Sequence, residues 1–327
     1  LSECFEIAAG TEQGHPLTTE LFKCYIHELS IRLNNISGIN SPQLNRLNVT
    51  HLLWADDLVM LALDKESLQI MIDELHSFSE EWGLQVNIKK TAILIFNISG
   101  RQLLDSSRFT YGEARIPSVR EYCYLGTTFT INGSTKANQE QLRIKGLRAY
   151  FSLKSTIDIT SISKGAIFKL FDSLISPVVS YGCQVWLPTT KLIDCVVNSE
   201  RKADREIVSA ISMDPMEKLH LSLLKWTLGV KRKTTNIPIW GDTGRHPIAI
   251  SMVKLIIDFH NRLAMLNDKN SPLIVRHAFV EQITLNLPWF KMVNELCCKL
   301  DPNAPKHCKR DGASPKPNSL LIKNRLE

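Results

Sequence analysis

The sequence predicts an α+β fold, with helices on one face of an antiparallel sheet, followed by an all-α region. Apolar residues recur at helical spacing over 17–33 and 64–82, and short apolar runs beside these stretches are typical of strands. From about residue 135 onward the pattern becomes helical. With 44% hydrophobic residues, the 327-residue chain can bury a sizeable core and can hold about two domains.

In the first part of the chain, two helices flank a predicted hairpin. The first helix is expected over Leu17–Leu33, with Thr18 or Thr19 as its cap. The second is expected to begin after Asp64 and to end at Gly83, a residue that favours the C′ position. Further strands are expected at residues 84–88, 92–96, 108–111 and around 122–128.

The second part of the chain reads as a series of helices. Residues 164–181 are strongly apolar, but Pro177 should end or kink a helix there. Beyond about residue 300, prolines interspersed with Lys and Ser predict a disordered tail. Other helical stretches are expected around residues 136–154, 200–211, 217–228 and 250–266.

The segment Leu52–Ala62 places two adjacent carboxylates, Asp56 and Asp57, inside an otherwise apolar run. A buried carboxylate pair is costly without a compensating cation, so we expect both residues at the turn of a hairpin between two short strands. Hard oxygen ligands on a tight turn suit Mg²⁺, which binds through one or two carboxylates plus substrate phosphates. The alternative is an ordinary Asp-Asp turn, since Asp favours turn geometry.

Other segments occur with this pair in a fixed order, and together they resemble the palm motifs of reverse transcriptases, most closely those of non-LTR (LINE-type) retrotransposons. The resemblance covers roughly residues 1–265 and implies a partial polymerase palm followed by a thumb-like region. The matching palm segments are Gly10–Phe22, Leu52–Ala62, Trp82–Thr91 and Tyr122–Gly126, and Ser180–Trp186 and Leu224–Val230 resemble segments that follow the palm.

The resemblance assigns roles to individual residues. It implies that Asp56 is the principal metal ligand, that Asp57 supports it, and that Lys90 protonates or neutralises the pyrophosphate leaving group. Lys89 is an equally placed neighbour, and a solvated lysine pair is the alternative. The implied nucleotide- and template-binding residues are Gln13, Gly14 and Trp54, and the implied primer grip is Tyr124, Leu125 and Gly126. Trp54 could equally be a core aromatic residue.

One departure from the family concerns catalysis. The family uses a third aspartate upstream of the Gln-Gly segment, yet residues 1–55 contain no Asp. The chain also begins without Met, inside the first motif. We therefore expect a C-terminal fragment that lacks the upstream motif and the fingers and is inactive alone. The rival interpretations are a non-catalytic nucleic-acid-binding remnant and, more remotely, a metal-dependent hydrolase.

Charge is distributed unevenly along the chain. Residues 1–137 carry 11 Lys and Arg against 16 Asp and Glu, whereas residues 138–262 carry 18 against 11. This balance fits an acidic metal-binding part followed by a basic part that holds a nucleic-acid duplex. The alternative is a solvated basic surface that binds no ligand. The candidate nucleic-acid-binding residues are Arg143, Lys145, Arg148, Lys231, Arg232 and Lys233.

The expected organisation is a palm over residues 1–135, a helical thumb-like region over 136–265 and a C-terminal extension over 266–327. The implied cofactor is Mg²⁺, and the implied partners are an RNA template, a DNA primer or duplex, and deoxynucleotides. The eight cysteines lack CxxC spacing and fit reduced thiols, so we expect an intracellular location in nucleus or cytoplasm. No apolar run approaches the length of a membrane span, so no membrane partner is expected.

Overall fold

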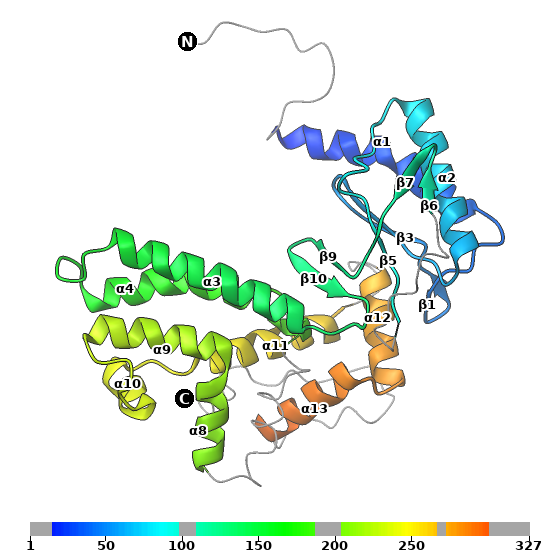
Figure 1. Cartoon of the computed structure of the whole chain (residues 1–327). Helices are drawn as coiled ribbons and strands as arrows, with labels where there is room; N and C mark the ends of the chain where they lie inside the picture. Colours follow the sequence, from blue (N-terminus) through cyan, green and yellow to red (C-terminus); the bar gives the residue numbers. More distant parts are fainter. Residues whose placement is uncertain (1–14, 98–108, 187–203, 267–272, 301–327) are drawn as a thin grey trace, which may run out of the picture. The chain divides into compact units, whose positions relative to one another are not determined.

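The computed structural model describes residues 15–97, 109–186, 204–266 and 273–300 (Figure 1). The chain divides into two compact units, Leu1–Arg120 and Glu121–Glu327. Helices combine with small two-stranded ladders, so the α+β class is confirmed. The division lies after Arg120, because the hairpin that follows it belongs with the helices of the second unit, and the expected domain limits at 135 and 265 stay predictions. The backbone amide of Thr128 in this hairpin donates to the Asn138 side chain at 3.0 Å.

Unit 1 is built on two helices, α1 (Pro16–Asn35) and α2 (Lys65–Trp82). Their apolar faces meet in a core that includes Leu29, Leu33 and Phe78. The paired strands are β1 (Gln43–Leu44) with β2 (Leu47–Asn48), β3 (His51–Trp54) with β4 (Asp57–Met60), β5 (Ile93–Leu94) with β8 (Ser118–Val119), and β6 (Phe109–Tyr111) with β7 (Ala114–Ile116).

The structure shows which residues cap the ends of α1 and α2. The Asp64 carboxylate accepts from the Ser67 amide at 2.8 Å, and Gly83 ends α2 in the left-handed conformation with φ 65°, both as predicted. The expected Thr18 or Thr19 cap of α1 is wrong. His15 caps this helix instead, because Pro16 begins it and the His15 ring accepts from the Leu17 amide at 3.2 Å.

The expected single antiparallel sheet is wrong for the described residues, which form separate two-stranded pairs, and β5 pairs with β8 in parallel. Residues 84–88 form no strand. Burial does alternate along them, and Leu84 and Val86 pack against the α1–α2 core. The backbone then turns instead of pairing, because the amides of Lys90 and Thr91 donate to the Asn87 carbonyl at 3.0 and 3.1 Å.

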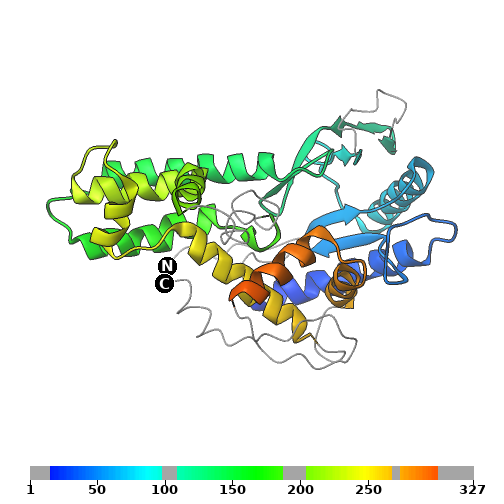
Figure 2. The same ribbon diagram turned by 90° about the horizontal axis from the view of Figure 1, so that it is seen from below.

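Unit 2 begins with a hairpin and continues as helices. In both views α3 and α9, which are in contact, lie side by side (Figures 1 and 2). The elements are β9 (Glu121–Tyr124), β10 (Thr127–Thr130), α3 (Lys136–Thr156), α4 (Lys164–Leu170), α5 (Ser176–Val179), α6 (Cys183–Trp186), α8 (Asp204–Met213), α9 (Pro215–Leu228), α10 (Asn236–Thr243), α11 (Ile248–Ala264), α12 (Leu273–Thr284) and α13 (Pro288–Leu300).

Pro177 interrupts its helix as predicted. A π-helical segment, Phe171–Ile175, separates α4 from α5, which carries Pro177 in its first turn. Proline has no amide to donate and its ring clashes with the carbonyl four residues earlier, so the preceding turn widens. The expected tail beyond residue 300 and residues 200–203 of an expected helix lie outside the described residues.

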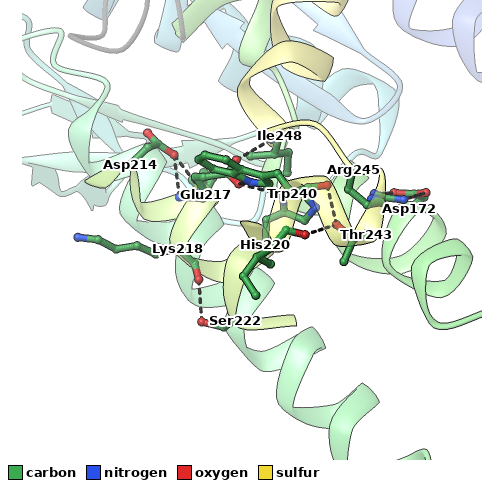
Figure 3. Close-up of polar contacts among 12 residues, drawn as sticks. Asp172, Asp214, Glu217, Lys218, His220, Ser222, Trp240, Thr243, Arg245 and Ile248 are labelled. Carbon is green, nitrogen blue, oxygen red and sulfur yellow. Dashed lines mark hydrogen bonds and ion pairs between the residues drawn. The ribbon is translucent and has the colours of Figure 1, made fainter. Parts of the chain in front are cut away.

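Glu217 lies at the junction of α9, α10 and α11, and its side chain is fully buried (Figure 3). One carboxylate oxygen accepts from the Ile248 amide at 2.6 Å and the other from the Trp240 indole at 3.0 Å. The ring nitrogen Nδ1 of His220 lies 3.0 Å from the second oxygen. The buried carboxylate is therefore satisfied by three separate groups and joins the three helices.

Two features flank this junction (Figure 3). Asp214 caps α9 by accepting from the amides of Met216 and Glu217 at 2.9 and 3.1 Å. Burial raises the pKa of Asp214, while these amide bonds oppose the rise. Arg245 forms a two-pronged ion pair with Asp172 of the π-helical segment, with one contact at 2.7 Å. None of the described helices has the length and apolar character needed to cross a membrane.

Candidate functional site

The hairpin β3–β4 carries the two candidate metal ligands of unit 1. Its strands pair from His51 with Met60 to Trp54 with Asp57, which leaves Ala55 and Asp56 as a two-residue turn. Asp56 thus lies in the turn as predicted, but Asp57 is the first residue of β4. The strands pair one residue closer to the turn than expected. Because Trp54 pairs with Asp57, only Ala55 and Asp56 remain in the turn.

The turn has an unusual backbone. Ala55 has φ 51°, a region that residues with a Cβ rarely adopt. Such a conformation costs on the order of 1 kcal/mol or more and persists only where the surrounding structure enforces it. Strained turns of this kind cluster at functional sites, and here the strain falls on the residue directly before the two aspartates.

Both aspartates are exposed to solvent. Within the described part of the chain, neither carboxylate has a hydrogen-bond or ion-pair partner, so no backbone amide bond supports the plain-turn alternative. Two exposed oxygen donors side by side in the sequence fit the one or two carboxylates that Mg²⁺ takes from protein. Among the described residues, no group of three or more His, Cys, Asp or Glu side chains is placed to hold a metal ion.

A polar chain anchors the base of this hairpin to α1. The Thr50 hydroxyl donates to the Asn34 side chain at 3.0 Å, so its oxygen accepts from Nδ1 of His51 at 2.9 Å. Nε2 of His51 then accepts from the Ser30 hydroxyl at 2.7 Å. Burial lowers the pKa of His51, which favours this neutral ring. Sequence reasoning missed this anchor; its signal is the polar pair Thr50-His51 at the start of an apolar strand.

Unit 2 contains a second tight hairpin, β9–β10, in which Tyr124 pairs with Thr127. Its two turn residues, Leu125 and Gly126, have φ 46° and 78°. Two consecutive positive φ values are typical of the type I′ turn, which matches the twist of the flanking strands. The candidate primer-grip residues Tyr124, Leu125 and Gly126 thus form the end of one hairpin, with Leu125 exposed at its tip.

The basic candidates of unit 2 differ in their surroundings. Arg143 donates two hydrogen bonds to Glu140, at 2.8 and 2.6 Å, and these bonds lower the pKa of Glu140. Lys145 and Arg148 are exposed on one helical stripe of α3 that bears no acidic residue, namely Gln141, Lys145, Arg148, Ser152 and Ser155. The other candidates, Lys231, Arg232 and Lys233, are exposed in the loop between α9 and α10.

Comparison with known proteins finds relatives for the part of the chain that contains the β3–β4 hairpin. Residues 2–129 match the family model described as reverse transcriptase (RNA-dependent DNA polymerase). The chain is 29% identical over 143 residues to the Pol polyprotein of the type-2 retrotransposable element R2DM of Drosophila melanogaster, covering 42% of this chain and 13% of that protein. Residues 2–129 therefore match reverse transcriptases, and the similar proteins include Pol polyproteins of R2 retrotransposable elements.

Two further relatives extend this result. A transposon-derived protein of Caenorhabditis elegans is 28% identical over 170 residues, which are 51% of this chain and 59% of that protein. The Pol polyprotein of a type-1 retrotransposable element R2 of Nasonia vitripennis is 29% identical over 133 residues, 38% of this chain and 13% of that protein. The chain therefore spans less than two thirds of each of these relatives.

The other candidate residues of the segment that matches reverse transcriptases differ in how the structure describes them. Gln13 and Gly14 lie outside the described residues. Trp54 is 67% exposed beside the β3–β4 turn, so the core-aromatic alternative is wrong. Lys89 and Lys90 are both exposed in the turn after residue 87, so burial does not distinguish the two lysines.

Proposed function

We propose that the chain contributes to RNA-directed DNA synthesis, with residues 1–135 as part of the polymerase palm and residues 136–265 as its thumb-like region. The observation that carries this proposal is the exposed Asp56–Asp57 pair at a strained hairpin, inside the segment that matches reverse transcriptases. Among the described residues, neither carboxylate has a hydrogen-bond or ion-pair partner that would give it a structural role. A cation-dependent role would explain why two adjacent carboxylates are left exposed.

In this proposal Asp56 and Asp57 would hold divalent magnesium together with phosphate oxygens of the nucleotide. Magnesium bound there would supply activation of the primer 3′-hydroxyl and stabilisation of the charge that develops on the phosphorus. The anchor from His51 to α1 keeps the base of the hairpin fixed, so that the two carboxylates need no rearrangement when the substrate arrives. Lys90, or its neighbour Lys89, neutralises the pyrophosphate leaving group.

The hairpin β9–β10 in this scheme contacts the primer terminus through Leu125 and Gly126, and the basic stripe of α3 holds the duplex backbone. A template strand of RNA, a DNA primer and deoxynucleotides are the corresponding partners, and the site of action is intracellular. The second candidate function is binding of nucleic acid without catalysis. It is favoured by the lack of an aspartate in residues 1–55, which leaves the family's third carboxylate without a counterpart there.

Duplex binding is expected to be weak, independent of sequence and sensitive to salt. Each phosphate contact that is lost should reduce the slope of log affinity against log salt concentration by about 0.9 on B-form DNA. Changing Lys145 and Arg148 together to Ala should therefore lower both affinity and slope, whereas Gln141→Ala on the same stripe should change neither. Fluorescence anisotropy between roughly 50 and 200 mM salt measures this, and affinity that is independent of salt would contradict it.

Catalysis by the 327-residue chain alone is expected to be absent, because residues 1–55 offer no counterpart of the family's third aspartate. A primer-extension assay with Mg²⁺, an RNA template and all four deoxynucleotides measures this. Template-dependent product that disappears in Asp56→Ala would show that the chain is complete enough for catalysis. That result would also remove the argument for a non-catalytic remnant.

A further inference from the structure

The segment Ser180–Trp186 resembles one that follows the palm in reverse transcriptases, and the proposed function gives it no role. Tyr181 lies just after α5, and its hydroxyl donates to the backbone carbonyl of Leu125 at 2.8 Å. Leu125 is the first of the two turn residues of the β9–β10 hairpin, and 56 positions separate it from Tyr181. A side chain from a distant segment thus holds the tip of the hairpin directly.

The Tyr181 ring also covers the second turn residue. A Cβ atom added at Gly126 would lie 3.2 Å from Cε1 of the ring, which is closer than ordinary van der Waals contact. Gly126 has φ 78°, so glycine is favoured there by both the backbone and the neighbouring ring. The turn is therefore fitted against Tyr181 at both of its residues.

Tyr181 is in turn fixed to the helical core. Its carbonyl accepts from the indole of Trp186 at 2.8 Å, and Trp186 is 4% exposed. The Gln184 carbonyl accepts from the indole of Trp289 in α13 at 2.7 Å. This series of contacts connects the tip of an exposed hairpin to the interior of unit 2.

The hairpin has a second support on β10, where the buried Asn138 side chain accepts from the Thr128 amide at 3.0 Å. Asn138 restrains the body of the hairpin near the start of α3, whereas Tyr181 restrains the turn itself. Without the Tyr181 hydroxyl, the turn would keep its strand pairing but lose the only described side-chain hydrogen bond to the Leu125 carbonyl.

We propose that Tyr181 is a positioning residue for the primer terminus, since its hydroxyl sets the orientation of the Leu125–Gly126 turn. This inference rests on the proposed function of that hairpin as the contact for the primer 3′ end. Tyr181 itself need not touch nucleic acid. Its effect is confined to the turn, so duplex affinity through the basic stripe should not depend on it.

The test uses the full chain and the variant Tyr181→Phe, which keeps the ring over Gly126 and removes only the hydroxyl. Tyr25→Phe is the matched control, because the Tyr25 hydroxyl also donates to a backbone carbonyl, that of Trp82 in unit 1. Two duplexes are compared, one with a recessed primer 3′ end and one blunt. Anisotropy gives their affinities, 2-aminopurine at the primer terminus reports local contact, and hydrogen exchange follows residues 121–130.

In Tyr181→Phe, the preference for the recessed end should fall about fivefold and exchange in 121–130 should rise by a similar factor, the scale of one neutral hydrogen bond. Blunt-duplex affinity should stay within about twofold, and Tyr25→Phe should match the unmodified chain in every readout. If Tyr181→Phe keeps the full preference for the recessed end, the proposed role of Tyr181 is wrong, but the proposed function of the hairpin is not affected. An unmodified chain that does not distinguish the two ends overturns the proposed function of the hairpin and this inference with it.

Discussion

Glu217→Ala is expected to lower the free energy of unfolding of the helical unit by about 3–5 kcal/mol, the usual cost of removing one partner from a buried charged network. The Ile248 amide and the Trp240 indole would each lose their acceptor inside the core. Each buried donor left unsatisfied costs about 1–3 kcal/mol. His220 would lose its partner as well, and its Nε2 atom is already buried without one among the described residues.

Urea unfolding followed by tryptophan fluorescence measures this change, because Trp226 and Trp240 pack against the core of unit 2. The matched control is Glu206→Ala on α8, where the glutamate is exposed and the expected change is within about 0.5 kcal/mol. Equal midpoints for the two variants would mean that the Glu217 junction does not hold the three helices together.

Gly146→Ala is expected to destabilise the same unit by about 1–3 kcal/mol through overpacking. Gly146 lies where α3 meets α5 and α9, and a Cβ atom there would be 2.3 Å from Cγ1 of Val179 and 3.0 Å from Cδ2 of Leu219. Both neighbours are buried, so neither can move aside freely. Alanine gains up to about 1 kcal/mol of helix propensity over glycine, which offsets only part of this cost.

Gly165→Ala in α4 is the matched control, since no atom lies within 4 Å of its added Cβ. This variant should leave the unfolding midpoint unchanged or raise it. Thermal unfolding measures both variants: the midpoint should fall for Gly146→Ala and should stay unchanged or rise for Gly165→Ala. A rise in midpoint for Gly146→Ala would mean that α3 and α5 are further apart than the structure has them.

Sequence reasoning succeeded where a single local pattern decides the structure. Asp64 and Gly83 are residues with strong preferences for helix ends, and two adjacent carboxylates inside the otherwise apolar run Leu52–Ala62 predict a hairpin turn. Pro177 interrupts its helix because its missing amide acts locally. His15 rarely caps a helix, so the sequence alone favours Thr18 or Thr19, whereas Pro16 and the His15 ring set the start of α1.

The features that sequence reasoning missed depend on contacts between distant segments. The Thr50-His51 pair gains meaning only beside Ser30 and Asn34, which α1 brings to the base of the hairpin. Glu217 looks like an ordinary surface residue of an amphipathic helix, yet α10 and α11 enclose it. The strands were expected as one sheet because periodicity predicts strands but not their partners.

The central claim is that the Asp56–Asp57 pair is the cation-binding end of a polymerase site. The direct measurement is the binding of Mn²⁺, as a paramagnetic substitute for Mg²⁺, by electron paramagnetic resonance in the presence of primer–template and deoxynucleotide. Replacing both aspartates by Asn should weaken Mn²⁺ binding at least about tenfold, or about 1.4 kcal/mol. Asp73→Asn, an exposed aspartate of α2, should leave it unchanged. Equal Mn²⁺ affinity for the unmodified chain and the double variant would contradict the claim.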